Sequence, residues 1–343
     1  MIELSRVSKF FGDTPAVLDF SLAVKEGEFC CLIGPSGCGK TTTLKMINRM
    51  VESSGGDIRV GGSRINEFRP YELRRSMGYV IQSIGLFPHM TVTENICVVP
   101  RLFKWERGRA RARALELLEL FDMPPDRFKD KYPRELSGGQ AQRIGVARAL
   151  AGDPDILLMD EPFGALDPIS RANLQQQFLR IQSELRKTVV FVTHDVDEAV
   201  RLASRIVLMR DGRLIQTDTP ERMLSLPADE FVERFFGSDR SLKRLSRLRV
   251  RDAMRVGIPE AAHPGKEKGN AVPDGIGAYG NPGPWSLAPD KAEEDSASAV
   301  LDVNGDLRLA LALLLQHRRQ RLPVRDGEGR VQGELNLLDL LGV

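Results

Sequence analysis

Three short stretches of the chain are apolar at nearly every position. They lie at residues 28–33, 156–159 and 189–193, and each is followed by glycine or by polar residues. Strands that are apolar on both faces belong to a largely parallel sheet covered by helices. Helical patterns occupy residues 41–50, 103–120 and 173–185. Residues 1–236 therefore predict one α/β unit, with a ligand site at the carboxyl ends of its strands.

The pattern changes after residue 236. Residues 237–256 form a linker, in which the run 240–251 carries six basic residues. Residues 257–298 hold seven glycines and six prolines in 42 residues, a composition typical of a flexible insertion without a fold of its own. Residues 299–343 then predict a helix at 307–317, a hairpin around the turn at 326–329, and a short helix at 337–341. We expect this last fragment to be too small for a stable domain alone.

Composition and charge narrow the classes of function. Lys and Arg number 49 against 47 Asp and Glu, so the net charge of +2 gives no argument for a nucleic-acid partner. The longest apolar run, at residues 309–315, is far shorter than the roughly 20 residues that span a bilayer. Four cysteines, two of them adjacent, do not make a disulfide framework. We expect a cytosolic protein that could serve a membrane by docking to other subunits. The basic run at 240–251 is either a solvated linker or a segment attracted to anionic lipid.

A glycine-rich loop follows the first apolar run and precedes a helix. Its sequence fits the phosphate-binding pattern G-x-x-x-x-G-K-[ST]. Backbone N–H groups of such a loop surround phosphate oxygens, and the helix N-terminus adds partial positive charge. The lysine would contact the β- and γ-phosphates, and the first threonine hydroxyl would coordinate Mg²⁺. The residues predicted to bind nucleotide here are Gly34, Pro35, Ser36, Gly37, Cys38, Gly39, Lys40, Thr41 and Thr42.

Two carboxylates end the second apolar run. Asp160 stands at the strand tip, where it would help to hold the Mg²⁺. Glu161 follows and could polarise a water in line with the γ-phosphate as a general base. Together with the phosphate loop, the pair predicts nucleotide hydrolysis.

A second helix end is also suited to an anion. Ser137 and Gln140 form the pattern of a capping box, and Gly138 and Gly139 leave the end of the helix at 141–150 open. One chain thus offers two phosphate-binding helix ends but only one phosphate loop. Either both ends face one nucleotide, or two chains share two nucleotides across a two-fold axis.

These motifs resemble those of the ATP-binding-cassette (ABC) ATPase subunits over about residues 1–236. The phosphate loop, Gln82, the signature Leu136-Ser-Gly-Gly-Gln140, Asp160-Glu161, Ala165-Leu-Asp167 and His194 follow the family's order. The resemblance implies a P-loop NTPase fold of class α/β, a mostly parallel sheet with a helical subdomain. It also implies a homodimer closing head to tail around two Mg-ATP, in which Ser137, Gly138 and Gly139 act on the partner's ATP.

The resemblance assigns further roles residue by residue. Phe11 matches the aromatic that stacks on adenine, although Phe10 could supply that ring instead. Gln82 matches the glutamine that touches Mg²⁺ and the attacking water. His194 matches the histidine that hydrogen-bonds the γ-phosphate. Asp167 lies in the loop that links the two sites of the dimer.

Within the ABC family, a single phosphate loop without membrane spans indicates the separate ATPase subunit of an importer. The stretches 77–96 and 99–105 are similar to osmoprotectant importers of the glycine betaine, choline and carnitine type. Residues 250–254 with 322–340 look like one small α+β regulatory motif of the cystathionine-β-synthase (CBS) type, split by the insertion, where such ATPases commonly carry two. The implied partners are membrane permease subunits and, through them, an extracytoplasmic binding protein. The implied place is the cytoplasmic face of the membrane. The alternatives are an importer of another small solute, an amino acid or polyamine, and a non-transport ABC ATPase.

Overall fold

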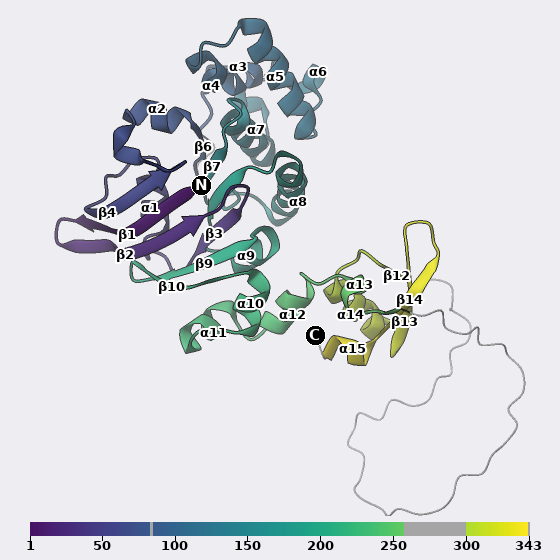
Figure 1. Cartoon of the computed structure of the whole chain (residues 1–343). Helices are drawn as coiled ribbons and strands as arrows, with labels where there is room; N and C mark the ends of the chain where they lie inside the picture. The colour runs from purple at the N-terminus through teal and green to yellow at the C-terminus, as the bar shows by residue number, and fades with distance from the viewer. Residues whose placement is uncertain (83–84, 257–299, 342–343) are drawn as a thin grey trace, which may run out of the picture. The chain divides into compact units, whose positions relative to one another are not determined.

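The computed structural model describes residues 1–82, 85–256 and 300–341. The chain divides into two compact units, Met1–Arg244 and Leu245–Val343 (Figure 1). The division falls inside the stretch predicted as a linker. The predicted insertion at 257–298 lies outside the described residues.

The first unit contains two sheets. A four-stranded antiparallel sheet has the order β2-β1-β4-β5, and a six-stranded sheet has the order β10-β9-β3-β8-β7-β6. In the second sheet, β6, β7, β8, β3 and β9 run parallel, and β10 is antiparallel to β9. The strands are β1 Ile2–Phe11, β2 Thr14–Val24, β3 Phe29–Ile33, β4 Gly55–Val60, β5 Ser63–Arg64, β6 Met77–Val80, β7 Ile156–Asp160, β8 Thr188–Val192, β9 Arg205–Arg210 and β10 Arg213–Asp218.

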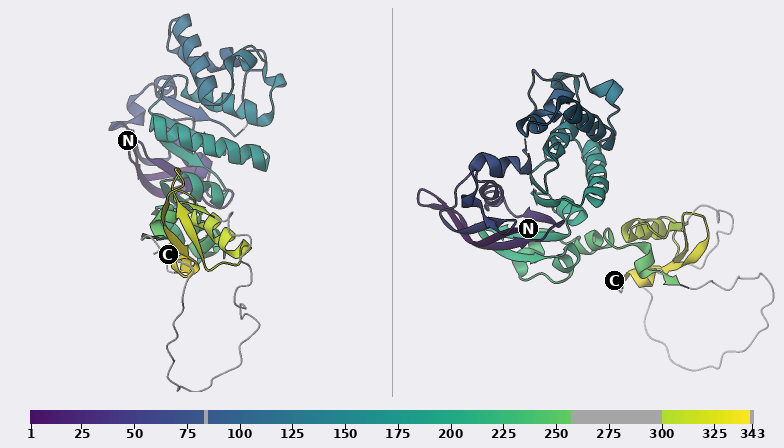
Figure 2. Two further views of the ribbon diagram at one scale, coloured as in Figure 1. Left: turned by 90° about the vertical axis from the view of Figure 1, so that its right-hand side faces the viewer. Right: turned by 45° about the horizontal axis from the view of Figure 1, so that its top comes forward.

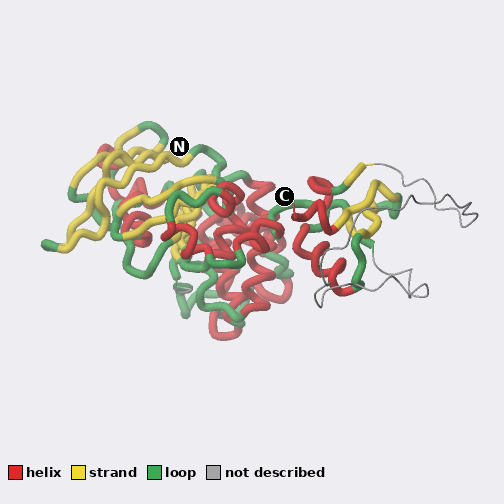
Figure 3. Tube along the Cα trace, turned by 90° about the horizontal axis from the view of Figure 1, so that it is seen from below, coloured by secondary structure: helices red, strands yellow, loops and turns green. Residues whose placement is uncertain are grey.

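Helices cover the six-stranded sheet and extend from it (Figure 1). Helices α3 to α6 group together away from the antiparallel strands β1, β2 and β4, and the two further views agree (Figures 1 and 2). Seen from below, the strands of this unit gather on one side and most of its helices on the other (Figure 3). The helices are α1 Lys40–Ile47, α2 Pro70–Arg75, α3 Val92–Ile96, α4 Val98–Leu102, α5 Arg107–Leu120, α6 Pro125–Phe128, α7 Gly138–Leu150, α8 Pro168–Leu185, α9 Val196–Leu202, α10 Pro220–Ser225, α11 Glu230–Phe236 and α12 Arg240–Leu245.

The strand β3 shows why the apolar runs lack alternation. Phe29, Cys31 and Ile33 pack into one core cluster with residues of α5, α7 and α8. Cys30 and Leu32 face the other way, into a cluster with β1, β2 and α1. All five residues of β3 are buried, so both faces of the parallel sheet are covered as predicted. The P-loop α/β class of the unit is confirmed.

Several predicted helix limits were wrong by one turn. The helix expected from residue 103 begins at Arg107, because Lys104 has a positive φ of 57° and the Glu106 side chain caps the helix. The helix expected to run to residue 50 ends at Ile47, before Arg49 with φ 53°. The helix expected from residue 173 begins at Pro168. Proline and the capping Asp167 favour an earlier start than the apolar pattern shows.

Two side chains of the basic run at 240–251 form ion pairs inside the first unit. Lys243 of α12 lies 2.8 Å from Asp239 and 3.6 Å from Asp197, and only 14% of its side chain is exposed. Arg240 pairs with Glu233 at 2.7 Å. These two cations are therefore held by acids of the protein rather than free in a solvated linker.

The second unit joins residues from both sides of the insertion. Its sheet has the order β11-β14-β13-β12, with β11 Arg255–Val256, β12 Leu301–Asp302, β13 Arg321–Arg325 and β14 Val331–Asn336. The predicted hairpin is β13–β14, which is antiparallel. Leu245 and Val250 share a core with Leu314 and Leu335. The helices are α13 Val250–Ala253, α14 Leu307–Gln316 and α15 Leu337–Leu341. Residues 245–256 thus supply the strand β11 and part of the core, Leu245 and Val250, that the fragment 299–343 lacks.

Candidate functional site

The glycine-rich loop joins β3 to α1 and has a backbone that larger residues would not adopt. Gly34, Gly37 and Gly39 all have positive φ, of 146°, 79° and 103°. A Cβ atom at Gly34 would collide with the carbonyl oxygen of Met209, and one at Gly39 with that of Ala16. The loop therefore needs glycine at these positions to lie so close to the neighbouring backbone.

Lys40 begins α1 and folds over this loop. Its ammonium donates to the carbonyl oxygens of Gly34 at 2.8 Å and Pro35 at 3.0 Å, and lies 3.7 Å from Cys38 Sγ. Lys40 is 6% exposed. None of these three hydrogen-bond partners carries a full negative charge, so the buried ammonium suits a phosphate anion.

Thr41 and Asp160 meet although they stand far apart in the sequence. The Thr41 hydroxyl donates to Asp160 Oδ1 at 2.8 Å, across the gap between the start of α1 and the end of β7. Burial raises the pKa of the Asp160 carboxyl above its usual value, and the hydrogen bond from Thr41 opposes this effect. A hydroxyl and a carboxylate side by side are oxygen ligands of the kind that Mg²⁺ prefers.

Glu161 stands in an unusual backbone conformation at the tip of β7. Its φ is 45°, in the left-handed region, and its N–H donates to Val192 O at 3.0 Å. One carboxylate oxygen, Oε2, accepts from Gln82 Nε2 at 3.2 Å and lies 3.1 Å from His194 Nδ1. The end of β7, the end of β8 and the chain after β6 thus bring three predicted residues together.

The signature residues lie elsewhere on the unit. Ser137 and Gln140 form the predicted capping box at the start of α7, with hydrogen bonds of 3.3 and 3.0 Å. Nothing lies within 4 Å of a Cβ placed on Gly138, and at Gly139 the nearest atom is Ser170 Cβ at 3.3 Å. Among the described residues, no hydrogen bond or ion pair joins this helix end to the phosphate loop. The two helix ends predicted to bind anions are therefore not linked by such an interaction in the described residues.

Asp167 and Phe11 are both exposed. Asp167 caps α8, and hydrogen bonds from the Ser170 side chain and backbone lower the pKa of its carboxyl. Phe11 is 54% exposed, and Lys9 Nζ lies 5.0 Å from its ring centre. Phe10 is exposed by 42%. Both rings are exposed, so either could stack on adenine.

Sequence reasoning missed the side chains that hold these loops. Arg148 of α7 donates to Gly85 O at 2.8 Å and so fixes the segment after Gln82. Arg171 of α8 donates to Leu166 O at 3.1 Å, next to Asp167. Both arginines lie on helices that begin at a motif, but neither arginine is part of that motif. Their partners are backbone oxygens of distant loops, which residue types alone do not reveal.

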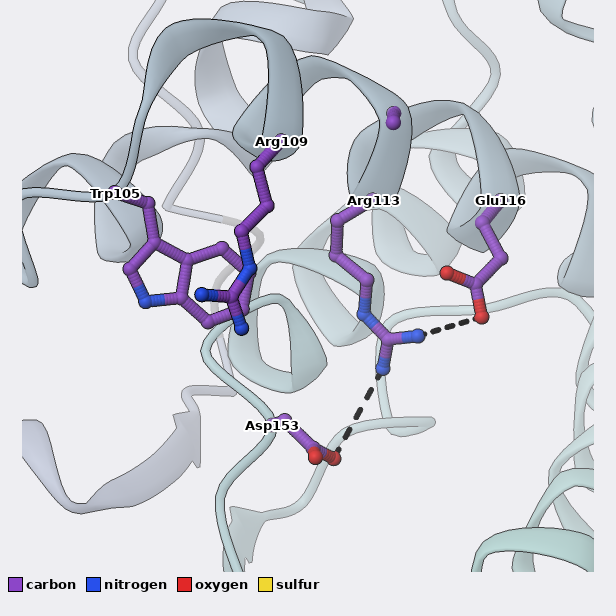
Figure 4. A pocket seen from close by; sticks show the side chains of 6 residues that line it. Trp105, Arg109, Arg113, Glu116 and Asp153 are labelled. Carbon is purple, nitrogen blue, oxygen red and sulfur yellow. Dashed lines mark hydrogen bonds and ion pairs between the residues drawn. The ribbon is translucent and has the colours of Figure 1, made fainter.

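A cavity of about 340 Å³ lies on the helical part of this unit and contains none of the predicted residues. Trp105, Arg109, Arg113, Glu116 and Asp153 line it together with Ala112 (Figure 4). The Arg109 guanidinium stacks 3.9 Å above Trp105, and Arg113 lies 2.6 Å from Glu116 and 4.0 Å from Asp153. The charged side chains that line the cavity are largely paired with one another or stacked on Trp105. The cavity therefore gives no argument for nucleotide binding.

Comparisons with known proteins address the family. A family model described as ABC transporter matches residues 17–164. The glycine betaine uptake system ATP-binding protein YehX of Escherichia coli (strain K12) is 45% identical over 342 residues, 99% of each chain. The chain belongs to the ABC transporter family. It is an ATP-binding protein of that family, and the matched residues 17–164 lie inside the range 1–236 that the motifs predict for the cassette.

Two further relatives complete the comparison. The glycine betaine/carnitine/choline transport ATP-binding protein OpuCA of Bacillus subtilis (strain 168) is 56% identical over 244 residues. That match covers 71% of this chain, which spans 64% of the length of the relative. The dimeric structure of a post-hydrolysis state of the ATP-binding cassette MJ0796, bound to ADP and Pi, is 35% identical, with a TM-score of 0.57. It covers 64% of this chain and 98% of its own. In the described ranges of this cassette protein, no helix is both long and apolar enough to cross a bilayer.

Proposed function

We propose that this chain binds Mg-ATP in its phosphate loop and hydrolyses it within a homodimer, and that hydrolysis drives solute import through membrane permease subunits. The observation that carries the proposal is the convergence of Gln82 and His194 on Glu161 Oε2, beside the pair of Thr41 and Asp160. A general base, a water-positioning amide, a histidine and a metal-binding pair are the parts that phosphoryl transfer to water requires.

The phosphate loop supplies binding. The glycines at 34, 37 and 39 let the backbone approach phosphate oxygens closely, and Lys40 gives them a buried positive charge. Thr42 is half-buried in the first turn of α1, where its N–H faces the same helix end. Phe11, exposed on β1, would stack on the adenine. Release of Lys40 from the Gly34 and Pro35 carbonyls would accompany phosphate binding.

The metal site would be formed by Thr41, Asp160 and Gln82. Their oxygen atoms fit Mg²⁺, which draws charge from the β- and γ-phosphates when bound. Asp160 is 8% exposed, so the carboxylate is shielded from bulk water. Burial raises the pKa of the Asp160 carboxyl because it disfavours the charged form. A bound Mg²⁺ would favour the charged form.

Glu161 would act as the general base. Its side chain is 20% exposed, so Oε2 remains within reach of a water molecule. Gln82 and His194 both contact this oxygen and would orient the carboxylate. Gln82 would also contact the attacking water, and His194 would hydrogen-bond the γ-phosphate. Proton removal by a positioned carboxylate contributes about 10²- to 10⁴-fold to a rate.

Dimerisation would complete the site. The helix end formed by Ser137, Gly138, Gly139 and Gln140 is exposed at Ser137 and Gly138. Within the described residues no hydrogen bond or ion pair ties it to the chain's own phosphate loop, so it could reach ATP held by a partner copy. The MJ0796 cassette forms a dimer, which supports this arrangement. Asp167, at the loop before α8, would lie near the boundary between the copies.

The transported solute is proposed from the relatives. YehX and OpuCA are named for uptake of glycine betaine and, for OpuCA, of carnitine and choline. We propose quaternary-amine osmoprotectants, delivered by an extracytoplasmic binding protein to the permease, with this chain peripheral on the cytoplasmic membrane face. No nucleic acid takes part. The CBS-like part of the tail stays a prediction. The alternatives, an amino acid or polyamine importer or a non-transport ATPase, differ from this in the outcome of one experiment.

That experiment compares uptake of labelled glycine betaine, choline and spermidine in cells with and without the gene, at low and high osmolarity. The proposal predicts loss of quaternary-amine uptake and of growth at high osmolarity, both restored by the wild-type gene but not by Glu161→Gln. Loss of spermidine uptake alone would support a polyamine importer. Unchanged uptake of every solute would contradict the transport function.

A further inference from the structure

The segment that carries His194 is held by one buried hydroxyl. Thr193, the residue before it, is 2% exposed, and its hydroxyl donates to Glu198 Oε2 at 2.7 Å. The Thr193 hydroxyl oxygen also accepts from the N–H of Asp195, the residue after His194, at 3.0 Å. The backbone on both sides of His194 is therefore fixed to the same point.

Glu198 is the centre of this arrangement. It lies in the first turn of α9 and is 5% exposed. While Oε2 takes the Thr193 hydroxyl, Oε1 accepts from Gln175 Nε2 of α8 at 3.1 Å. Burial raises the pKa of the Glu198 carboxyl, and its hydrogen bonds oppose the shift. A buried carboxylate with both oxygens occupied has little freedom to move.

Arg171 of α8 extends the network to a second loop. Its guanidinium donates to Leu166 O at 3.1 Å and lies 3.7 Å from Asp195 Oδ2. Its Nε lies 4.0 Å from Glu198 Oε1. The Arg171 side chain thus contacts both the loop of Leu166 and Asp167 and the segment that carries His194.

The side chain of His194 itself has little packing to hold it. It is 62% exposed, and its contact with Glu161 spans 3.1 Å. The position of the ring therefore depends on the backbone at 193–195. A shift of about 1 Å in a catalytic group, caused by a change away from the chemistry, can cost about 10²-fold in rate.

We propose that Glu198, through Thr193 and Arg171, is a positioning residue that holds His194 in place against Glu161 for ATP hydrolysis. The inference rests on the proposed function. A purely structural role is the competing account, because Asp195 also caps α9 with hydrogen bonds to the N–H groups of Asp197 and Glu198. The two accounts differ in whether the effect of breaking the network passes through His194.

The first test replaces one hydroxyl in the full-length chain. Thr193→Val removes the hydrogen bond to Glu198 at constant volume, and Thr193→Ser keeps it. Thr188→Val is the matched control, because Thr188 is 1% exposed, lies at the other end of β8, and accepts from Gly27 N at 3.0 Å. We expect Thr193→Val to lower kcat about tenfold with unchanged KM. Thr193→Ser should keep kcat near the wild-type value, and Thr188→Val should leave kcat within about twofold of wild type.

The second test makes the same change without the histidine. In a His194→Ala background, measured by single-turnover release of labelled phosphate, Thr193→Val should lower the rate by less than twofold. A full tenfold loss in that background, or no loss in the presence of His194, would overturn the positioning role. A wild-type chain that hydrolyses no ATP, alone or with permease, would instead contradict the proposed function. Glu198→Gln provides a second variant and should give the same split of kcat and KM.

Discussion

Glu161 Oε2 lies 3.1 Å from His194 Nδ1 and accepts a hydrogen bond from Gln82 at 3.2 Å, so one oxygen atom joins three chain segments. The segments follow β6, β7 and β8, which are neighbours in the parallel sheet. Carboxyl ends of parallel strands meet at one edge, and this explains how residues 79 and 33 positions away from Glu161 reach the same atom.

Replacing the proposed base should separate hydrolysis from binding. Glu161→Gln keeps the shape of the side chain but removes the charge that attracts a proton. We expect kcat to fall by about 10²- to 10⁴-fold while the Kd for Mg-ATP changes by less than about threefold. Labelled phosphate release and nucleotide titration measure the two quantities. Hydrolysis at the wild-type rate would show that another residue is the base.

The metal-binding pair predicts a change in Mg²⁺ dependence. Thr41→Val removes the hydroxyl that Asp160 accepts from at 2.8 Å, and Thr41→Ser retains it. We expect the Mg²⁺ concentration for half-maximal hydrolysis to rise about tenfold in Thr41→Val, equivalent to about 1.4 kcal/mol, and to stay near the wild-type value in Thr41→Ser. Equal Mg²⁺ titrations for both variants would argue against Thr41 as a ligand.

Two glycines should respond to substitution in opposite ways. A Cβ at Gly39 collides with the backbone of Ala16 where φ is 103°, so Gly39→Ala should disturb the loop and abolish ATP binding by the monomer. Gly138 has open space around it. Gly138→Asp should therefore leave Tm within about 2 °C and monomer ATP binding intact, yet stop hydrolysis, because the added carboxylate would face the partner's γ-phosphate. Weakened ATP binding by monomeric Gly138→Asp would place that glycine in its own chain's site.

An ion pair beside the cavity predicts a pH dependence of stability. The hydrogen bond from Lys187, at 2.9 Å, lowers the pKa of Asp153 below its usual value. The contribution of this ion pair to the free energy of unfolding is therefore fully present above the unfolded pKa of about 3.9. It is lost as the pH falls through the lower folded pKa of Asp153. Asp153 is 61% exposed, so we expect Lys187→Gln to cost about 0.5 kcal/mol of unfolding free energy at pH 6. Urea unfolding should show the difference between the two proteins shrinking as the pH falls through the folded pKa of Asp153. A difference that stays constant in acid would contradict the assignment.

Some parts of the site were predictable because their signals are local. The phosphate loop, the Ser137 capping box and the carboxylates Asp160 and Glu161 are each set by a few consecutive residues. The strand pattern places the phosphate loop and the two carboxylates at one sheet edge. The parallel sheet followed from apolar runs without alternation. The left-handed conformation of Glu161 and the network around Glu198 had no such signal. Gln175 and Glu198 are 23 residues apart, and Arg171 reaches a backbone oxygen that every residue has.

The second unit shows a different reason for failure. The fragment 299–343 alone lacks a strand and part of its core, and Val250 and β11 supply them from the other side of residues 257–299. Pairing between segments so distant depends on burial of Leu314 and Leu335 with residues before the insertion, which local patterns do not encode.

The shared site of the dimer is the central claim, and the mass of Glu161→Gln in solution tests it most directly. One chain has a mass of 38.2 kDa. Multi-angle light scattering should give that mass without nucleotide and twice that mass with Mg-ATP, and addition of Gly138→Asp to the same chain should return it to the monomer value. A nucleotide-dependent dimer that persists in the double variant, or a monomer under all conditions, would contradict the account.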